Sequence, residues 1–286
     1  MEQLSYLKAE NIHQLIDAAI LEDIGEGDHS TLASVPADTQ SQARLIIKDQ
    51  GILAGITLAK IIFERIDPRL EVECLLADGA SVKNGDIGLY VRGAARSILQ
   101  AERLVLNCMQ RMSGIATKTA HFRSLICHTK AQLLDTRKTT PNFRILEKWA
   151  VHIGGGRNHR FALYDMIMLK DNHIDFAGGI RPAIEATQAY LARIGKRLKI
   201  EVETRNLDEV KEVLAVGGVD YIMLDNMSPE TMREAVALIG TQAQTEASGG
   251  ITEESIAAVA ETGVDFISVG ALTHSVRSLD ISLKAF

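Results

Sequence analysis

Seven residues between positions 135 and 173 have side chains that can bind an anion. They are five cations and two histidines: Arg137, Lys138, Arg157, Arg160, Lys170, His159 and His173. The formal net charge of the chain is −6, so this segment concentrates positive charge against the overall balance. Arginine presents a planar fork of donors that fits carboxylate or phosphate, and lysine presents a point charge. The segment therefore predicts a binding site for a small ligand with several negative charges.

Two acidic residues end neighbouring predicted strands further along the chain. Glu203 follows the apolar run 200–202, and Asp225 follows the run 221–224. Carboxylates in such positions suit Mg²⁺ that is held partly through water and partly through phosphate oxygens. Glu201 lies on the same strand as Glu203, and we expect it to point the opposite way and to be structural.

Small residues follow the last two predicted strands, in Ser248–Gly250 and Gly270–Leu272. Glycines there let backbone N–H groups approach an anion, and (β/α) barrels commonly bind phosphate after their last strands. We expect these two loops to bind a phosphate, with His274 close enough to contact it.

A series of strands and helices must position these groups. The expected strands are Gln132–Leu134, Met166–Leu169, Ile200–Val202, Tyr221–Leu224, Glu246–Ala247 and Phe266–Val269. Helices are predicted to begin near Asn206, Ser228 and Thr252. Alternating strands and helices imply parallel strands with right-handed crossovers, and six of them form a complete or partial barrel. Each strand ends in polar or glycine residues, where barrels hold their chemistry, so the pattern favours an enzyme.

The first third of the chain has a different pattern of apolar and polar residues. Residues 11–22 and 97–114 have helical periodicity, and the second helix places Arg103, Asn107 and Gln110 on one face. Short runs at 43–48, 51–55, 70–76 and 88–92 are typical of strands. Apolar and polar residues alternate at 279–283, which predicts that this segment adds a strand to the N-terminal domain. The expected fold is α/β: an N-terminal α+β sandwich domain of residues 1–115, joined by 276–286, and an open or incomplete (β/α) barrel of residues 116–275.

The composition narrows the class of protein. The pI of about 5.8 argues against a general binder of nucleic acid or membrane surfaces. Three cysteines without metal-site spacing are typical of a reduced cytosolic protein. We find neither a signal-peptide pattern nor an apolar run that could cross a membrane, and we expect a cytoplasmic location.

Ordered motifs along nearly the whole chain, from about residue 22 to residue 283, resemble those of the quinolinate phosphoribosyltransferase family, also called carboxylating nicotinate-nucleotide pyrophosphorylases. The matching segments are Glu22–Gly25, Gly27–Asp28, Ala101–Arg103, Asn107, Ser113–Thr117, Asp135–Thr140, Asn158–Arg160, Lys170, Asn172–His173, Leu224–Asn226, Ser248–Gly250 and Ser268–Thr273. Two departures are small. Asn142 stands where the family often has glycine, and asparagine tolerates left-handed backbone geometry. Thr204 replaces a common apolar residue.

The resemblance implies a pentosyltransferase of NAD biosynthesis that converts quinolinate and phosphoribosyl pyrophosphate, with Mg²⁺, to nicotinate mononucleotide, pyrophosphate and CO₂. It also implies a homodimer with shared active sites, possibly assembled further. Lys138, Glu203 and Asp225 are the implied catalytic residues, and Glu203 and Asp225 would hold the metal and ribose hydroxyls. Arg137, Arg160 and Lys170 would clamp quinolinate, with Arg103 supplied by the neighbouring subunit. The remaining implied substrate contacts are Thr136, His159, Ser248, Gly249, Gly250, Val269, Gly270, Ala271 and His274.

Three alternatives stay open from the sequence. The first is a paralogue of the same fold that is associated with molybdate-transport operons. The second is nicotinate phosphoribosyltransferase, whose monocarboxylate substrate needs fewer cations. The third, of another class, is a regulatory barrel that binds phosphate without catalysis, and the paired acids Glu203 and Asp225 with the full cationic set argue against it.

Overall fold

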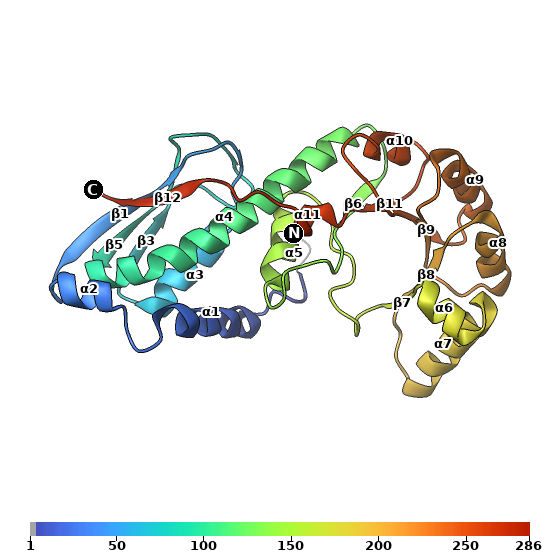
Figure 1. The fold of residues 1–286 in the computed structure, drawn as a ribbon, viewed down its shortest axis with the longest axis horizontal. Coiled ribbons are helices and arrows are strands. Elements are labelled where there is room, and N and C mark those ends of the chain that lie inside the picture. Colours follow the sequence, from blue (N-terminus) through green and yellow to red (C-terminus); the bar gives the residue numbers. More distant parts are fainter. Residues whose placement is uncertain (1–3) are drawn as a thin grey trace. The chain divides into compact units, whose positions relative to one another are not determined.

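The structure is a computed structural model that describes residues 4–286, and the chain divides into two compact units (Figure 1). Unit 1 consists of the segments up to residue 120, 138–155 and 271–286, and unit 2 consists of 121–137 and 156–270. Each unit is therefore built from segments that are distant in sequence.

Unit 1 contains an antiparallel sheet with the strand order β12-β1-β5-β3. Its strands are β1 (Gln40–Ile47), β3 (Glu71–Cys74), β5 (Ile87–Ala94) and β12 (Ile281–Ala285), and a separate pair is β2 (Gly51–Ile52) and β4 (Ser81–Val82). Leu45 of β1 pairs with Leu89 of β5, and both are fully buried. The predicted C-terminal strand is confirmed, because β12 pairs with β1 from Ala43 to Ile47.

The helices of unit 1 complete its α+β character. They are α1 (Ala9–Ile24), α2 (His29–Ser34), α3 (Ile56–Ile66), α4 (Ala95–Leu125), α5 (Arg144–Ile153) and α11 (Ala271–His274). The end of α4 extends into the sequence of unit 2. Gly114 of α4 lies so close to the carbonyl of Arg277 that any side chain at 114 would overlap it. This close approach explains a glycine within a long helix, which otherwise costs stability.

Unit 2 contains six parallel strands in the order β6-β11-β10-β9-β8-β7, as expected for the barrel (Figure 1). They are β6 (Gln132–Leu134), β7 (Ile167–Leu169), β8 (Ile200–Thr204), β9 (Tyr221–Asp225), β10 (Gln244–Ser248) and β11 (Phe266–Ser268). Among the described residues, the edge strands β6 and β7 do not pair with each other, so the barrel is open. The predicted fold class is confirmed.

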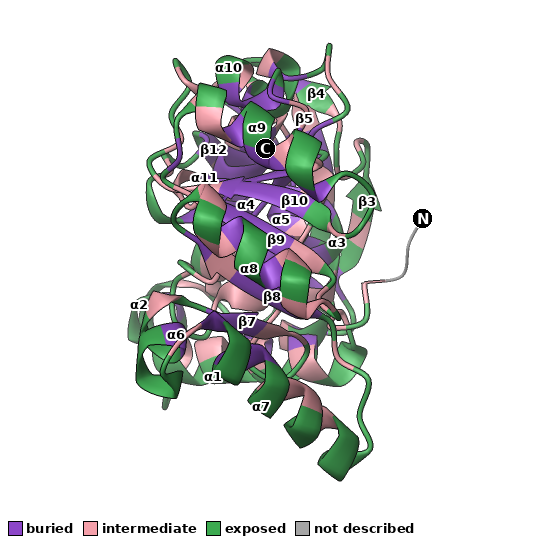
Figure 2. Cartoon of the chain, turned by 90° about the vertical axis from the view of Figure 1, so that its right-hand side faces the viewer, coloured by how far each residue is buried: buried purple, intermediate pink, exposed green. Residues whose placement is uncertain are grey.

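Helices cover the outer side of these strands and lead the chain back to each next strand. They are α6 (Asp171–Ala177), α7 (Ile180–Ile194), α8 (Leu207–Val216), α9 (Pro229–Ile239) and α10 (Ile256–Ala260). The helices α8 and α9 begin directly after Asn206 and Ser228, as predicted, and the side chains of both residues accept from amides of the first turn. Figure 2 shows buried residues in β8, β9 and β10, and exposed residues on the outward sides of α8 and α9.

The structure also tests the two departures from the family pattern. Asn142 has a φ of 61°, the left-handed geometry that was expected there. Thr204 is fully buried, and its hydroxyl donates to the carbonyl of Met223, so its polar group is satisfied. Across the described residues, we find no helix with the length and apolar character needed to cross a membrane.

Candidate active site

The register of the parallel sheet brings the strand-end groups of unit 2 to one edge. Side chains two residues apart on a strand share a face, and registered partners on neighbouring parallel strands share it too. Leu169 pairs with Val202, so Lys170 comes level with Glu203. Asp225 pairs with Ser248 on the next strand pair. Lys170, Glu203, Asp225 and Ser248 therefore follow one another along the carboxyl edge.

Two of these groups form an acidic pair. Glu203 and Asp225 are half-buried. Burial raises the pKa of Glu203 above its usual range, the negative charge of Asp225 raises it further, and Lys170 acts in the opposite direction. Two half-buried carboxylates that repel each other make a donor set suited to a hard divalent cation. This chemistry fits the expected Mg²⁺.

The cations of unit 2 also influence each other. Arg160 is half-buried, and its guanidinium donates to the carbonyl of Met166 at 3.2 Å. Burial lowers the pKa of Arg160, and the charge of Arg137 lowers it further. Lys170 is exposed, and its amide donates to Nδ1 of His173 at the start of α6. Positive charges held close together attract anions, so this group can bind a ligand with more than one negative charge.

The loop after β10 is shaped by close backbone packing. Gly249 has a φ of 91°, and any side chain there would overlap Asn226. Asn226 donates from its side chain to Asp225 at 2.7 Å, and its amide donates to the carbonyl of Ser248 at 2.9 Å. Gly249 thus allows the loop to lie against the end of β9. There Asn226 bonds to both the loop and Asp225, and so holds the Asp225 carboxylate in place.

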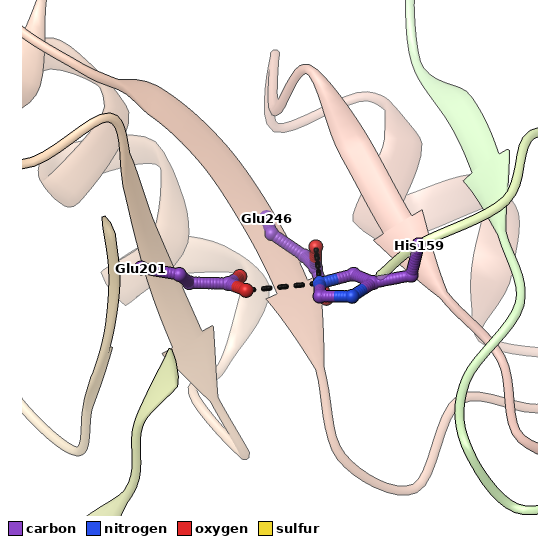
Figure 3. A group of neighbouring side chains, drawn as sticks. All are labelled: His159, Glu201 and Glu246. Atoms are coloured by element: carbon purple, nitrogen blue, oxygen red, sulfur yellow. Dashed lines mark hydrogen bonds and ion pairs between the residues drawn. The ribbon is translucent and has the colours of Figure 1, made fainter. Parts of the chain in front are cut away.

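His159 lies in the interior of unit 2, where its side chain is 7% exposed, and not at the surface. Its Nε2 atom is 2.9 Å from Glu201 and 3.2 Å from Glu246. Figure 3 shows both carboxylates pointing towards the ring. Both carboxylates are buried, and burial together with the charge of Glu246 raises the pKa of Glu201 to about 7. Within the described residues, these three side chains also form a group whose ligand atoms lie within 4.8 Å of one another.

The expected orientation of Glu201 was wrong. Glu201 and Glu203 are two residues apart on β8 and therefore point to the same face, not to opposite ones. Glu201 lies deeper along the strand, in contact with His159, while Glu203 lies at the strand end.

The remaining predicted site residues lie in unit 1, or in unit 2 after β6 and β11. Lys138 is exposed, and its carbonyl accepts from the hydroxyl of Thr273 at 2.8 Å. His274 is exposed and ends the short helix α11, which begins at Ala271 where a loop was expected. Arg103 is exposed on α4. Thr136 is half-buried in unit 2, and Val269, before Gly270, is buried there with its amide donating to Leu134.

Sequence reasoning missed four residues that surround these positions. Glu246 was seen only as part of a strand, although an acid within an otherwise buried strand is itself a signal. Asp135 was seen only as part of a motif, and its carboxylate accepts from Asn158 at 2.7 Å and from the amide of His159 at 2.9 Å. The half-buried Arg111 and the fully buried Glu147 form an ion pair in unit 1 that joins positions 36 residues apart, and no pattern in the sequence indicates it.

Comparisons with known proteins agree with this architecture. Residues 28–113 match the family model "Quinolinate phosphoribosyl transferase, N-terminal domain", and residues 115–284 match the model "Quinolinate phosphoribosyl transferase, C-terminal domain". The two models together span most of the chain.

Individual relatives are similar over nearly the whole of this chain. The chloroplastic nicotinate-nucleotide pyrophosphorylase [carboxylating] of Oryza sativa subsp. japonica is 47% identical, covering 96% of this chain and 77% of the relative. A probable nicotinate-nucleotide pyrophosphorylase [carboxylating] of Bacillus subtilis is 43% identical over 95% of this chain and 92% of its own. The crystal structure of NadC from Streptococcus pyogenes superposes with a TM-score of 0.92 at 40% identity, covering 98% of both chains.

Proposed function

Because the chain belongs to the quinolinate phosphoribosyl transferase family, we propose that it transfers phosphoribose from phosphoribosyl pyrophosphate to quinolinate and releases pyrophosphate and CO₂. The observation that carries the proposal is the cationic group of unit 2, in which Arg137 and Arg160 influence each other and Lys170 lies level with Glu203. Quinolinate has two adjacent carboxylates, and several fixed cations match that charge.

In the proposed mechanism, the protein acts by positioning and by electrostatics. Arg137, Arg160 and Lys170 hold the two carboxylates and so orient the pyridine nitrogen towards the anomeric carbon. Lys138 binds the pyrophosphate group, and Glu203 and Asp225 hold the ribose hydroxyls. Amides of the Ser248–Gly250 loop and of the residues after β11 bind the 5′-phosphate.

The bond changes need no protein nucleophile. The bond from the anomeric carbon to pyrophosphate breaks first, through an oxocarbenium-like state, and the pyridine nitrogen then forms a bond to that carbon. The ring is now cationic, so it accepts the electron pair released when the 2-carboxylate leaves as CO₂. A proton takes the position of the departed carboxylate.

Mg²⁺ is part of the proposal because the Glu203–Asp225 pair suits it. When bound, it would neutralise charge on the leaving pyrophosphate. Glu203→Gln with Asp225→Asn should abolish turnover and leave quinolinate binding largely intact, because cations hold quinolinate. Calorimetric titration of the double variant with quinolinate checks this, and a folded double variant that no longer binds quinolinate would refute the assigned roles.

The direct test of the proposed activity is to incubate the protein with quinolinate, phosphoribosyl pyrophosphate and Mg²⁺ and to measure CO₂. We expect quinolinate to be used and nicotinate to be a poor substrate, because nicotinate lacks the 2-carboxylate. Losing two charge-assisted hydrogen bonds weakens binding by about 10²- to 10⁴-fold. Efficient mononucleotide formation from nicotinate would favour a nicotinate-specific enzyme, and absence of turnover with either compound would favour a non-catalytic barrel or the molybdate-operon paralogue.

We also propose a homodimer with shared active sites, in which the exposed Arg103 serves the neighbouring subunit, and a cytoplasmic location. Arg103→Ala and Lys138→Ala should each be nearly inactive. A mixed dimer of the two variants then contains one intact site, so it should recover up to about half of the wild-type activity. A verified mixed dimer without recovery would place Arg103 outside its partner's site. Cell fractionation tests the location.

A further inference from the structure

The segment Asn158–Arg160 is held by three buried acids from three different strands or strand ends of unit 2. Asp135, directly after β6, accepts from the side chain of Asn158 and from the amide of His159. Glu201 on β8 and Glu246 on β10 contact Nε2 of His159. All three carboxylates are at most 1% exposed. This half-buried segment is therefore held by the interior of unit 2.

The hydrogen bonds of His159 define which ring nitrogen carries the proton. The amide of Arg160 donates to Nδ1 at 2.7 Å, so Nδ1 offers a lone pair. Nε2 therefore carries a proton, which Glu201 and Glu246 accept (Figure 3). Burial lowers the pKa of His159, but the hydrogen bonds to Glu201 and Glu246 raise it to about 10, which favours a second proton on the ring, and the contact of Nδ1 with the Arg160 amide opposes that proton. A doubly protonated ring would set an N–H of Nδ1 against the amide N–H of Arg160, two donors facing each other.

His159, Glu201 and Glu246 are residue types that can bind a metal ion. The hydrogen bond to Nδ1 of His159 nevertheless argues against a metal in this cluster. A histidine that binds a metal through Nε2 uses that nitrogen's lone pair and usually donates a proton from its other nitrogen. Here Nδ1 accepts, so a metal at Nε2 would require the ring to lose both protons. The contacts suit a hydrogen-bonded positioning cluster.

We propose that Glu201 and Glu246 are positioning residues that act through His159 to fix the backbone of Arg160, and thereby aim the Arg160 guanidinium at the substrate. The chain of contacts is continuous: the carboxylates hold Nε2–H, the ring accepts the Arg160 amide, and the guanidinium donates to the carbonyl of Met166. Each carboxylate retains a buried Oε1 atom without a hydrogen-bond partner among the described residues. Two acceptors for one N–H hold the ring from two strands, which restricts its rotation.

The first experiment does not depend on activity. Protein labelled with ¹⁵N-histidine is studied by NMR near neutral pH, and the signals of His159 are assigned by their loss in His159→Gln. We expect a proton on Nε2 and none on Nδ1. A doubly protonated ring, or metal-shifted signals together with a stoichiometric transition metal in the purified protein, would overturn the proposal.

The second experiment rests on the proposed function and uses matched variants of β10. Glu246→Leu removes one acceptor from the cluster, and Glu246→Gln keeps an oxygen that can accept from Nε2–H. Thr245→Val is the control, because Thr245 directly precedes Glu246 and so points to the other face of β10, is also buried, and donates from its hydroxyl to Asp265. All three are compared in KM for each substrate and in Tm.

We expect Glu246→Leu to raise KM for quinolinate by about tenfold, with little change in KM for phosphoribosyl pyrophosphate, and Glu246→Gln to restore most of the loss. Thr245→Val should lower Tm without changing either KM. If Glu246→Leu changes both KM values together, or behaves as Thr245→Val does, its role is only structural and the proposal is wrong. If the wild-type protein releases no CO₂ from quinolinate, the proposed function fails, and the NMR experiment still decides this inference.

Discussion

The two units each contain a buried cluster of charges, and the clusters differ in how completely their hydrogen bonds are satisfied. In unit 1, both oxygens of Glu147 are used: Oε1 accepts from Arg111 at 2.8 Å and from the hydroxyl of Thr140 at 2.9 Å, and Oε2 accepts from the Thr140 amide at 3.0 Å. In unit 2, Glu201 and Glu246 share one N–H of His159, and an oxygen of each has no partner within the described part of the chain.

This difference separates a structural ion pair from a positioning cluster. The Arg111–Glu147 pair balances one positive charge with one negative charge and also ties Thr140 and the carbonyl of Thr273 together. The His159 cluster has an excess of acid, which costs folding free energy, because buried acceptors without donors are unfavourable. Proteins retain such unfavourable groups mainly at functional sites.

The largest expected effect follows from breaking the satisfied pair. Glu147→Ala leaves Arg111 without its carboxylate, and we expect the free energy of unfolding to fall by about 3 kcal/mol. Urea unfolding followed by circular dichroism measures it. A loss below about 1 kcal/mol would mean that water replaces the carboxylate and that the pair is not structural.

Removing both partners should restore much of that loss. In Arg111→Met with Glu147→Leu, no charge is left buried, so we expect to regain about 2 kcal/mol relative to Glu147→Ala. The same unfolding experiment, arranged as a double-mutant cycle, gives the coupling energy. Additive losses in the two single variants would contradict a direct interaction.

A smaller loss of stability is expected at Thr273, which connects the Arg111–Glu147 pair to Lys138. Thr273 is fully buried, and Thr273→Val removes the hydrogen bond from its hydroxyl to the Lys138 carbonyl. We expect a loss of about 1 kcal/mol in the free energy of unfolding. If Lys138 binds pyrophosphate as proposed, KM for phosphoribosyl pyrophosphate should rise while KM for quinolinate does not. The reverse pattern of KM values would count against the role of Lys138.

The smallest change in stability is expected in the acid-rich cluster. Glu246→Gln removes a surplus charge, so the free energy of unfolding should change by less than about 1 kcal/mol near pH 5. The raised pKa of Glu201, about 7, means that the folded protein holds a proton there that the unfolded chain releases near its ordinary value of 4.5. Wild-type stability should therefore fall as the pH rises from about 4.5 to 7.

In Glu246→Gln the neighbouring charge is gone, which lowers the pKa of Glu201, so this fall should be shallower. Unfolding curves of wild type and variant at several pH values give the comparison. Identical slopes would show that Glu246 does not act on Glu201.

Periodicity and turn chemistry were enough to predict the barrel strands. The run 132–134 coincides with β6, and Asn206 and Ser228 begin helices where their capping chemistry predicts. The helix 97–114 was underestimated, because α4 continues to Leu125. The helices α3, α5, α6 and α7 were not predicted, and α10 begins at Ile256, four residues after Thr252. Tertiary packing decides such elements more than local pattern does.

The site residues at the strand ends could be predicted from the sequence, and the buried residues beneath them could not. Residues at strand ends carry their signal in the sequence, because a polar residue interrupts an apolar run. The partners of His159 lie 42 residues away on β8 and on the more distant β10, so only the folded sheet reveals them. The roles of Lys138, Arg160, Glu203 and Asp225 remain predictions that the experiments above test.

The pairing of β12 with β1 has a consequence for the order in which the sheet of unit 1 can form. Both segments of unit 2 lie between these two strands in the sequence. The sheet therefore cannot be completed until synthesis has passed Ala285, and until then β1, with Ala43, Leu45 and Ile47, is an edge strand open to other chains. Chaperone contact and aggregation of incomplete chains should therefore concentrate on unit 1.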